Sequence, residues 1–359
     1  MAANPFTPTF GAPPPLLVGR RDILDAFQDS LDEGPGSPGY VTLFTGGRGV
    51  GKTVMLNAAE DIARQAGFVV ISETATDGFV ERLRTAHLPK LMPKPRRRVK
   101  SVDTKLVGGF TLEDTPSSTV PLREMFDAVT LNQPILITLD EIQAGVISEL
   151  REFAVILQHS IREGRPLAFC AAGLPAAVDS LLNDKVLTFL RRADRHLLGA
   201  ADEAAVKKAF IQVIADSGRT ISGIDAEAAA RATGGYPFMI QLVGYHSWRQ
   251  SASKRTVSGA DVEAGADSAR RRVGRLVIEP ALNDLSGVDR TFLLRMAADD
   301  GPSKTADIGQ RMGVDANYIS QYRLRLIAAG MIIPVGHGRV DFALPHLREW
   351  LQGHAAIDT

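Results

Sequence analysis

The sequence predicts an α/β protein in which helices cover both faces of a parallel sheet. Two observations support this class. Short apolar runs alternate with helical periodicity over the first half of the chain, and one such run ends in a glycine-rich loop. The expected strands cover residues 40–45, 68–72, 135–139 and 167–172. Open α/β sheets bind ligands beyond the carboxyl ends of their strands, so we expect the functional site at that edge.

The composition limits the size, charge and location of the protein. The chain has 359 residues, 45% of them apolar, which suggests two or three domains. It carries 41 Lys and Arg against 41 Asp and Glu, so no net charge draws the whole molecule to nucleic acid. The single cysteine, Cys170, lies in the apolar run 167–172, and we expect it in the core rather than in a catalytic role. One cysteine suits a reducing cytoplasm.

The order of residue patterns predicts four regions. Residues 1–15 are rich in proline and lack a signal-peptide pattern, so we expect a flexible N-terminus. Residues 16–199 form the α/β domain, residues 200–280 only helices, and residues 281–359 a separate C-terminal unit. No apolar stretch approaches the roughly 20 residues of a membrane span. We therefore expect a cytoplasmic protein without membrane contact.

A basic insertion at about 82–120 interrupts the α/β domain. Eight Lys and Arg fall between residues 82 and 102 with no acidic residue among them, and prolines at 89, 93 and 95 disfavour a continuous helix. Two interpretations remain open. The insertion is a solvated surface segment, or it makes electrostatic contact with a phosphate backbone or an acidic partner.

The glycine-rich loop after the first strand has the form G-x-x-x-x-G-K-[ST], which predicts a nucleoside triphosphate site. Glycines let backbone N–H groups surround an anion, and the following helix points its positive end at the phosphates. Lys52 supplies a charge for the β- and γ-phosphates, and the Thr53 hydroxyl is placed to bind Mg²⁺. The candidate contacts are Gly46, Gly47, Arg48, Gly49, Val50, Gly51, Lys52 and Thr53.

A second candidate motif ends the apolar run 135–139. Asp140 follows the run directly and would hold the metal, while Glu141 would orient and deprotonate the attacking water. Adjacent acids after a strand can also simply begin a helix. Together with the phosphate loop, however, the second carboxylate favours hydrolysis over binding alone, because holding Mg²⁺ does not require it.

The C-terminal unit has the pattern of a winged helix. Helices are expected at 290–298, 305–312 and 316–329, followed by two short strands at 331–334 and 339–344. On the third helix, Asn317, Gln321 and Arg325 form a polar stripe that suits DNA contacts, with Arg339 on the wing. The segment 281–359 has eight Lys and Arg against nine Asp and Glu, which is unusual for a DNA reader. DNA binding and protein docking therefore both remain open.

Several of these motifs together resemble a known family. Leu-Val-Gly-Arg-Arg at 17–21, Leu-Asp-Glu at 139–141 and Gly-Gly-Tyr-Pro at 234–237 resemble AAA+ ATPases of the Orc1/Cdc6-like and STAND-type (archaeal-ATPase-like) branch. Residues 172–175 and 189–195 resemble a group of bacterial, mainly actinobacterial, ATP-binding proteins of this type. The resemblance covers nearly the whole chain, and the C-terminal winged helix completes the order.

The resemblance implies roles for residues outside the two motifs. Val18, Gly19 and Pro237 would lie near the adenine, under a helical lid at 200–280, with ATP and Mg²⁺ as cofactors. Arg191, Arg192 and Arg195 are candidates for a finger that reaches the γ-phosphate of a neighbouring subunit, or for intramolecular salt bridges with the lid. The sequence departs from the family pattern at two places, and both departures favour slow hydrolysis. Ala171 and Ala172 stand where a polar sensor residue is usual, and Tyr236 stands where a sensor arginine is common.

The motifs and the resemblance leave two functions open. The first is a DNA-associated ATPase, of replication initiator-like, mobile-element or phage-related type. The second is a STAND-like nucleotide-dependent switch that docks a protein partner without DNA.

Overall fold

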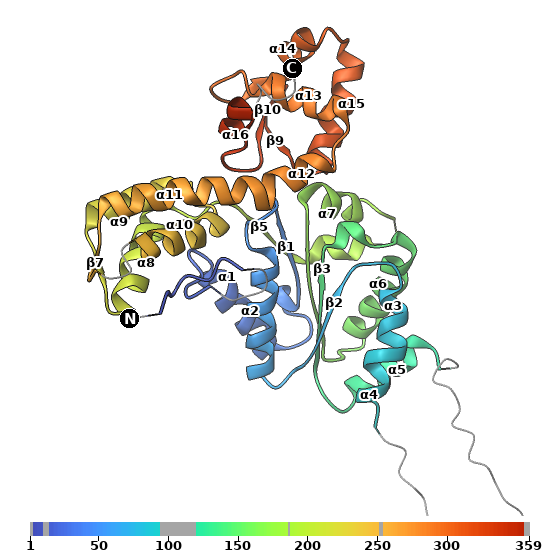
Figure 1. The fold of residues 1–359 in the computed structure, drawn as a ribbon. Coiled ribbons are helices and arrows are strands. Elements are labelled where there is room, and N and C mark those ends of the chain that lie inside the picture. Colours follow the sequence, from blue (N-terminus) through green and yellow to red (C-terminus); the bar gives the residue numbers. More distant parts are fainter. Residues whose placement is uncertain (1–2, 10–13, 94–119, 186, 251–253, 355–359) are drawn as a thin grey trace, which may run out of the picture.

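The computed structural model describes residues 3–9, 14–93, 120–185, 187–250 and 254–354. Figure 1 shows a sheet domain, a group of helices beside it and a C-terminal unit that lies across one end. Most of the predicted basic insertion lies outside the described residues. Among the described helices, none is long and apolar enough to span a bilayer.

A five-stranded parallel sheet forms the centre of the first domain, which confirms the predicted α/β class. Its strands follow the order β2-β3-β4-β1-β5, and every pair in it is parallel. The strands are β1 Val41–Gly46, β2 Val69–Thr74, β3 Ile135–Asp140, β4 Leu167–Gly173 and β5 Asp194–Leu198. The sequence predicted the first four and missed β5, one of the two edge strands.

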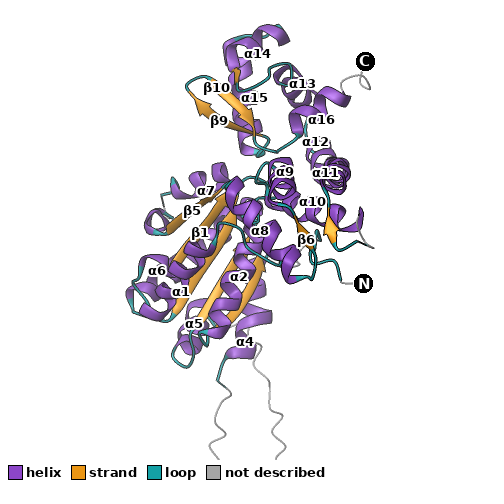
Figure 2. Ribbon diagram, turned by 90° about the vertical axis from the view of Figure 1, so that its left-hand side faces the viewer, coloured by secondary structure: helices purple, strands orange, loops and turns teal. Residues whose placement is uncertain are grey.

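Helices pack against both faces of this sheet (Figure 2). Phe44 and Cys170 face a core shared with α1 and α2, while Leu43 and Phe169 face the opposite core, because successive strand residues alternate between faces. Cys170 is fully buried as expected, and burial raises the pKa of its thiol. The covering helices are α1 Arg21–Glu33, α2 Lys52–Gln65, α5 Leu122–Thr130, α6 Ile147–Arg162 and α7 Pro175–Leu182.

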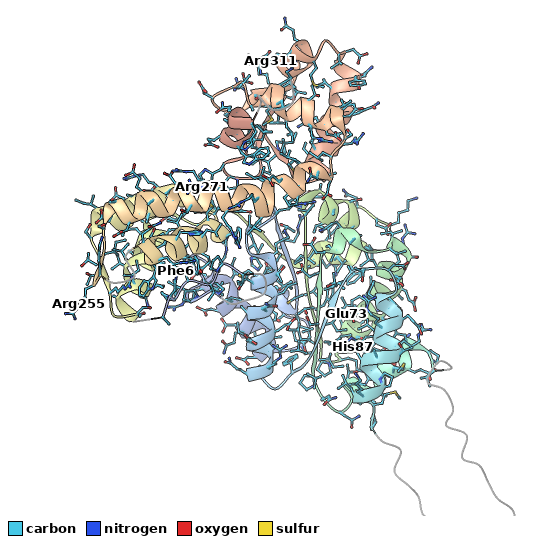
Figure 3. All side chains as sticks on the ribbon, in the orientation of Figure 1. Phe6, Glu73, His87, Arg255, Arg271 and Arg311 are labelled. Carbon is cyan, nitrogen blue, oxygen red and sulfur yellow. The ribbon has the colours of Figure 1, made fainter. Side chains whose placement is uncertain are left out.

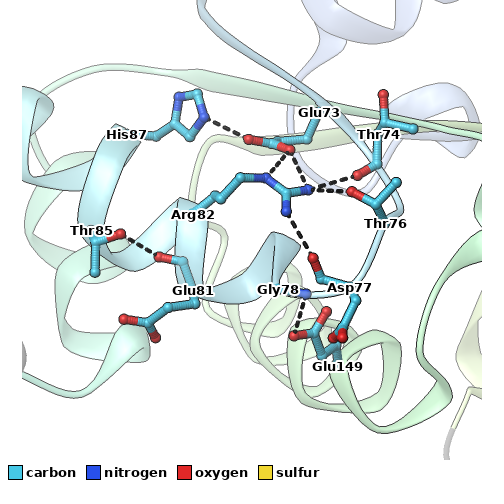
Figure 4. Close-up of polar contacts among 10 residues, drawn as sticks. All are labelled: Glu73, Thr74, Thr76, Asp77, Gly78, Glu81, Arg82, Thr85, His87 and Glu149. Carbon is cyan, nitrogen blue, oxygen red and sulfur yellow. Dashed lines mark hydrogen bonds and ion pairs between the residues drawn. The ribbon is translucent and has the colours of Figure 1, made fainter.

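The chain after β2 is held by one acidic side chain (Figure 4). Glu73 accepts a hydrogen bond from Arg82 Nε at 2.9 Å and lies 2.7 Å from His87 Nε2. Arg82 also donates to the carbonyls of Thr74 and Asp77. These bonds fix α3 Phe79–Arg82, the π-helical turn Leu83–His87 and α4 Leu88–Leu91, just before the described residues stop at 93. The cluster therefore braces this end of the domain.

In the predicted lid, residues 200–280, the described residues form four α-helices, a π-helical turn at Gly274–Ile278 and one short pair of strands. Serine side chains cap two of the helices: Ser222 accepts from Asp225 N, and Ser258 forms a capping box with Asp261. The prediction of helices alone was wrong at β6 Thr220–Ile221 and β7 Thr256–Val257, which pair in parallel. The helices are α8 Glu203–Asp216, α9 Gly223–Thr233, α10 Pro237–Gln250 and α11 Gly259–Val273.

Part of the expected flexible N-terminus is packed against this lid. Phe6 is 3% exposed, and its ring centroid lies 5.7 Å from that of Phe210 on α8 (Figure 3). A Cβ atom added at Gly244 of α10 would lie 2.4 Å from the Phe6 ring, so this glycine makes room for it. Residues 3–9 are thus anchored by an aromatic contact that proline-rich composition did not indicate.

The C-terminal unit contains the helices and strands that the sequence predicted. A three-stranded sheet of order β8-β10-β9 and a separate apolar core hold it together. Helix α12, strand β8 and the last helix were not predicted. The elements are α12 Glu279–Asn283, α13 Gly287–Met296, β8 Ser303–Lys304, α14 Thr305–Met312, α15 Ala316–Ala328, β9 Ile332–Gly336, β10 Arg339–Phe342 and α16 Leu347–His354.

The C-terminal unit packs against the sheet domain through α15 and against the helix that follows α11 through α16. Helix α15 contacts α7 of the sheet domain, and a Cβ atom added at Gly330 would lie 3.1 Å from Leu174 Cδ2. At the other contact, an added Cβ at Gly274 would lie 2.8 Å from Trp350 Nε1 of α16. Helix α15, the expected DNA-reading helix, therefore has one end against the sheet domain.

Candidate functional site

The phosphate loop connects β1, which ends at Gly46, to α2, which begins at Lys52. Gly49 has φ +73° and Gly51 has φ +92°, a left-handed conformation that glycine adopts without a Cβ clash. The turn at Gly51 sets the start of α2 directly after the loop. The positive end of the helix and its first unpaired N–H groups therefore face the loop, as an anion site requires.

Lys52 lies inside this loop. Its side chain is buried, and Nζ donates to the carbonyl oxygens of Gly46 at 3.1 Å and Gly47 at 2.8 Å. Burial lowers the pKa of Lys52, and the nearby Glu141 and Asp140 partly oppose that shift. The ammonium group is thus held where the phosphates of a nucleotide would enter the loop, and phosphate oxygens would be stronger acceptors than these carbonyls.

The two predicted halves of the site meet at Thr53 and Asp140. Thr53 Oγ1 lies 2.6 Å from Asp140 Oδ2, although 87 positions separate them in the chain. A hydroxyl beside a carboxylate is an oxygen donor set that fits Mg²⁺, which commonly binds one or two protein groups and takes its other ligands from phosphate and water. Within the described residues, no group of three or more His, Cys, Asp or Glu is placed to hold a metal ion.

Glu141 follows Asp140 with an unusual backbone conformation. Its φ is +54°, which is uncommon for a residue with a side chain and is often found at functional sites. Its N–H donates to Asp140 Oδ1 at 2.8 Å, so the strained residue is fixed to the neighbouring carboxylate. The Glu141 carboxylate accepts a hydrogen bond from Gln143 Nε2 and is otherwise exposed to solvent. It is therefore accessible to a water molecule next to the loop.

The lid touches the phosphate loop through Tyr236. The Tyr236 side chain is 2% exposed, and its hydroxyl donates to the Arg48 carbonyl at 2.6 Å. A Cβ atom added at Gly49 would lie 1.7 Å from that hydroxyl, so Gly49 is needed for this contact as well as for its φ. Burial raises the pKa of the Tyr236 phenol.

The residues predicted near the adenine lie around the same junction. Pro237 begins α10, and its Cβ lies 3.9 Å from a Cβ built on Gly51. Val18 packs against the core that the sheet and lid share, and Gly19 turns the chain with φ +65°. Pro237 is thus beside the loop, while a role for these three residues in adenine binding stays a prediction.

The three candidate finger arginines lie at the edge of the sheet, and two of them contact α7. Arg191 Nε donates to the Leu182 carbonyl at 2.7 Å, and Arg195 pairs with Asp179 at 2.8 Å. The expected intramolecular partner was the lid, and for Arg191 and Arg195 that expectation was wrong, because the 3-10 helix Thr188–Arg192 and β5 place these two residues beside α7. Arg192 is exposed and forms no side-chain hydrogen bond or ion pair with another described residue.

The predicted DNA-contacting stripe is only partly available. Asn317 and Gln321 are exposed on α15, and Arg339 is exposed on β10. Arg325, however, pairs with the buried Asp289 at 2.9 Å, and its guanidinium lies 5.1 Å from the centroid of the Tyr322 ring. Arg325 is thus paired within the C-terminal unit, although its side chain is 57% exposed, and a DNA contact by Arg325 stays a prediction.

The C-terminal unit also reaches the phosphate loop. Arg48 lies 3.9 Å from Asp284, which follows α12, and a Cβ atom built on Gly47 would be 3.9 Å from the Ala343 carbonyl. Both charged side chains are well exposed, so this pair contributes at most about 1 kcal/mol. The loop nevertheless has neighbours from the lid on one side and from the C-terminal unit on another.

Comparison with solved structures identifies the fold. A Walker-type ATPase of Pyrococcus abyssi matches with a TM-score of 0.67 and 14% identity, over 94% of this chain and 96% of that chain. The ORC2 protein of Aeropyrum pernix, solved as ADPNP–ADP complexes, matches with a TM-score of 0.63 and 14% identity, over 98% of both chains. The chain has the fold of AAA+ P-loop ATPases.

Sequence comparisons add one finding to the AAA+ fold. Residues 275–351 match a family described as a domain of unknown function, DUF8462. That match covers most of the C-terminal unit together with the segment that joins it to α11. No curated protein matches the sequence.

Sequence reasoning missed two residues that the AAA+ fold brings to the site. Tyr236 was noted only as a replacement for arginine, although its hydroxyl bonds the phosphate loop. Gln143 was not noted at all, yet it contacts Glu141 and the chain after β4. No local motif signals the Tyr236–Arg48 or the Gln143–Leu174 contact, since both depend on which strands and helices become neighbours, whereas Gln143 and Glu141 are only two residues apart.

Proposed function

We propose that this protein binds ATP with Mg²⁺ and hydrolyses it, acting in the cytoplasm. The observation that carries the proposal is the meeting of Lys52, Thr53 and Asp140 around one loop, with the Thr53 hydroxyl 2.6 Å from the Asp140 carboxylate. Glu141 adds an exposed carboxylate at the same strand end. These are a phosphate cation, an oxygen pair for a metal and a candidate base.

Each residue has a separate task in this proposal. Lys52 holds the β- and γ-phosphates in place of the carbonyls it now contacts. Thr53 and Asp140 would hold Mg²⁺, which when bound offsets charge on the phosphate oxygens. Glu141 orients a water molecule toward the γ-phosphate and accepts its proton. Tyr236 keeps the lid against the loop, so nucleotide and lid position are coupled.

The test is phosphate release by the full-length protein with ATP, with and without Mg²⁺. The proposal expects release that depends on Mg²⁺, and slow turnover, because the end of β4 offers Ala171 and Ala172 rather than polar side chains. A protein that neither binds ATP nor releases phosphate in Mg²⁺ contradicts the proposal.

Arg192 is the remaining candidate for a finger that acts between subunits, since Arg191 and Arg195 are engaged with α7. If Arg192 reaches a neighbouring γ-phosphate, ATPase activity per subunit should rise with protein concentration, and Arg192→Ala should remove the rise. Such fingers contribute roughly 10³–10⁵-fold in other systems. Activity per subunit that stays flat, with a monomer seen by light scattering in ATP, would show that no arginine acts in trans.

We further propose that the C-terminal unit is a winged helix that contacts duplex DNA. The three helices, the β9–β10 hairpin and the exposed Asn317, Gln321 and Arg339 support this function. A second candidate is a STAND-like switch that docks a protein. The engagement of Arg325 by Asp289 favours it, and so do Ile333 and Val335, which are 45% and 43% exposed on β9.

Duplex binding over a salt series, with ATP present, separates these two functions. For a DNA-binding protein, Gln321→Ala should cost about 1–3 kcal/mol on a preferred sequence, while Arg339→Ala should reduce the salt slope by about 1 on any sequence. Arg96, Arg97 and Arg98, which we expected to add a sequence-independent contribution, lie outside the described residues. If no duplex binds at low salt, the protein-docking switch becomes the better candidate.

A further inference from the structure

The loop after β3 places one amide side chain between two functional strand ends. Gln143 lies in the short 3-10 helix Ile142–Ala144, which begins directly after Glu141. Its Nε2 donates to Glu141 Oε2, and its Oε1 accepts from the Leu174 N–H at 3.1 Å. Leu174 follows β4, the central neighbour of β3 in the sheet. Gln143 therefore links the candidate base to the adjacent strand.

The sequence of β4 makes this link possible. Its last residues, Ala171, Ala172 and Gly173, have the smallest side chains, and all three are buried. A Cβ atom added at Gly173 would lie 2.5 Å from Ile142 Cγ1 and 3.1 Å from Gln143 Oε1. Any larger residue there would push the 3-10 turn away. Ile142, which is 4% exposed, fixes the turn in this position.

We propose that Gln143 is a positioning residue that holds the Glu141 carboxylate for water activation. The inference rests on the proposed ATPase function. Glu141 is an exposed side chain with several rotamers, and a base contributes only when it is held within reach of its proton. The amide has both a donor and an acceptor, so it ties the Glu141 carboxylate to the backbone N–H of Leu174, directly after β4. It also supplies the polar group that the end of β4 lacks.

The two hydrogen bonds of Gln143 distinguish a positioning role from an ordinary hydrogen bond at the surface. A bond between Gln143 and Glu141 alone would link two mobile groups and order neither. The second bond, to the Leu174 N–H, is partly buried and anchors the amide to backbone. The amide orientation follows from this anchor, because the oxygen must face Leu174 N–H, which leaves the NH₂ group for Glu141.

Two substitutions test the inference in a steady-state ATPase assay. Gln143→Met keeps the length of the side chain but removes both hydrogen bonds. Gln143→Glu keeps an oxygen for the Leu174 N–H and replaces the donor with a carboxylate that repels Glu141. We expect both to lower kcat by about 10- to 100-fold, the usual effect of losing an outer partner of a functional group. KM for ATP should change little, because neither variant touches the phosphate loop.

Gln158→Ala is the matched control, since Gln158 is exposed on α6 of the same domain. Its kcat should equal that of the wild type. Thermal melting of each variant checks folding. If Gln143→Met unfolds at a lower temperature than the wild type, the kcat of Gln143→Glu tests the inference. A normal or raised kcat in Gln143→Glu overturns the inference, as does a loss confined to KM.

Glu141→Gln in the same assay distinguishes failure of the inference from failure of the proposed function. If Glu141→Gln stops turnover while both Gln143 variants remain normal, Glu141 is the base and Gln143 does not position it. If the wild type releases no phosphate, or Glu141→Gln releases it at the wild-type rate, the role of Glu141 fails and the inference fails with it.

Discussion

Lys52→Ala is expected to abolish high-affinity ATP binding. The substitution removes a buried ammonium group that donates to the loop carbonyls of Gly46 and Gly47. Without Lys52, the triphosphate of a bound nucleotide would lie beside these carbonyl oxygens with no buried cation in the loop. Breaking a buried charge pair commonly costs about 3–5 kcal/mol, so affinity should fall at least about a hundredfold. Titration of a fluorescent ATP analogue in Mg²⁺ measures the change.

Arg48 is the other cation of the loop, and it is not expected to replace Lys52. Its guanidinium is exposed and directed to Asp284 in the C-terminal unit. Lys208→Ala is a suitable control, because Lys208 is exposed on α8 and its loss also changes the net charge by one. An unchanged dissociation constant for Lys52→Ala, in a variant that melts like the wild type, would mean that the nucleotide binds elsewhere.

Glu141→Gln is expected to keep ATP binding and to stop turnover. The amide has nearly the shape of the carboxylate, so the loop, Lys52 and the Thr53–Asp140 pair remain in place. It cannot accept the proton of the attacking water, and loss of a general base commonly costs ~10²–10⁴-fold in rate. Single-turnover phosphate release measures the chemical step, and titration in the same buffer measures binding.

Glu33→Gln is the control for this substitution, since Glu33 is an exposed carboxylate at the end of α1. It should leave both binding and turnover at wild-type values. Equal phosphate release by wild type and Glu141→Gln would remove Glu141 from the mechanism. Weak binding by Glu141→Gln would instead place the carboxylate among the groups that hold nucleotide or metal.

The strands of the sheet could be predicted where their residues are apolar on both faces. Runs such as Ile-Leu-Ile-Thr-Leu at 135–139 are buried by helices on both sides, so their composition alone indicates a strand. Strand β5 has the sequence Asp-Arg-His-Leu-Leu, and its Leu197 is 74% exposed. The polar start of β5 and the exposure of Leu197 give it the pattern of a loop, whereas the other edge strand, β2, begins with the apolar run Val-Val-Ile.

The two short strands of the predicted lid could not be predicted from the sequence, for a different reason. Strands β6 and β7 have two residues each, which is too short to show any period. They pair only because α8–α9 and α10–α11 turn at the same end of the lid. The packing of Phe6 could not be predicted either, because nothing near Phe6 in the sequence indicates the space that Gly244 leaves in α10.

The sequence by itself determined the parallel sheet, the phosphate loop and the residues that meet there. Lys52 and Thr53 follow the loop after β1, while Asp140 and Glu141 stand at the end of β3. Parallel strands end at one edge, so local motifs were enough to bring these residues together.

Only the tertiary structure decided which other side chains join these residues and which side chains pair elsewhere. Gln143 reaches the Leu174 N–H because β4 lies beside β3, Tyr236 reaches Arg48 because the predicted lid packs against the loop, and Arg325 pairs with the buried Asp289. These contacts join residues whose spacing along the chain carries no signal, because packing between distant helices and strands sets them.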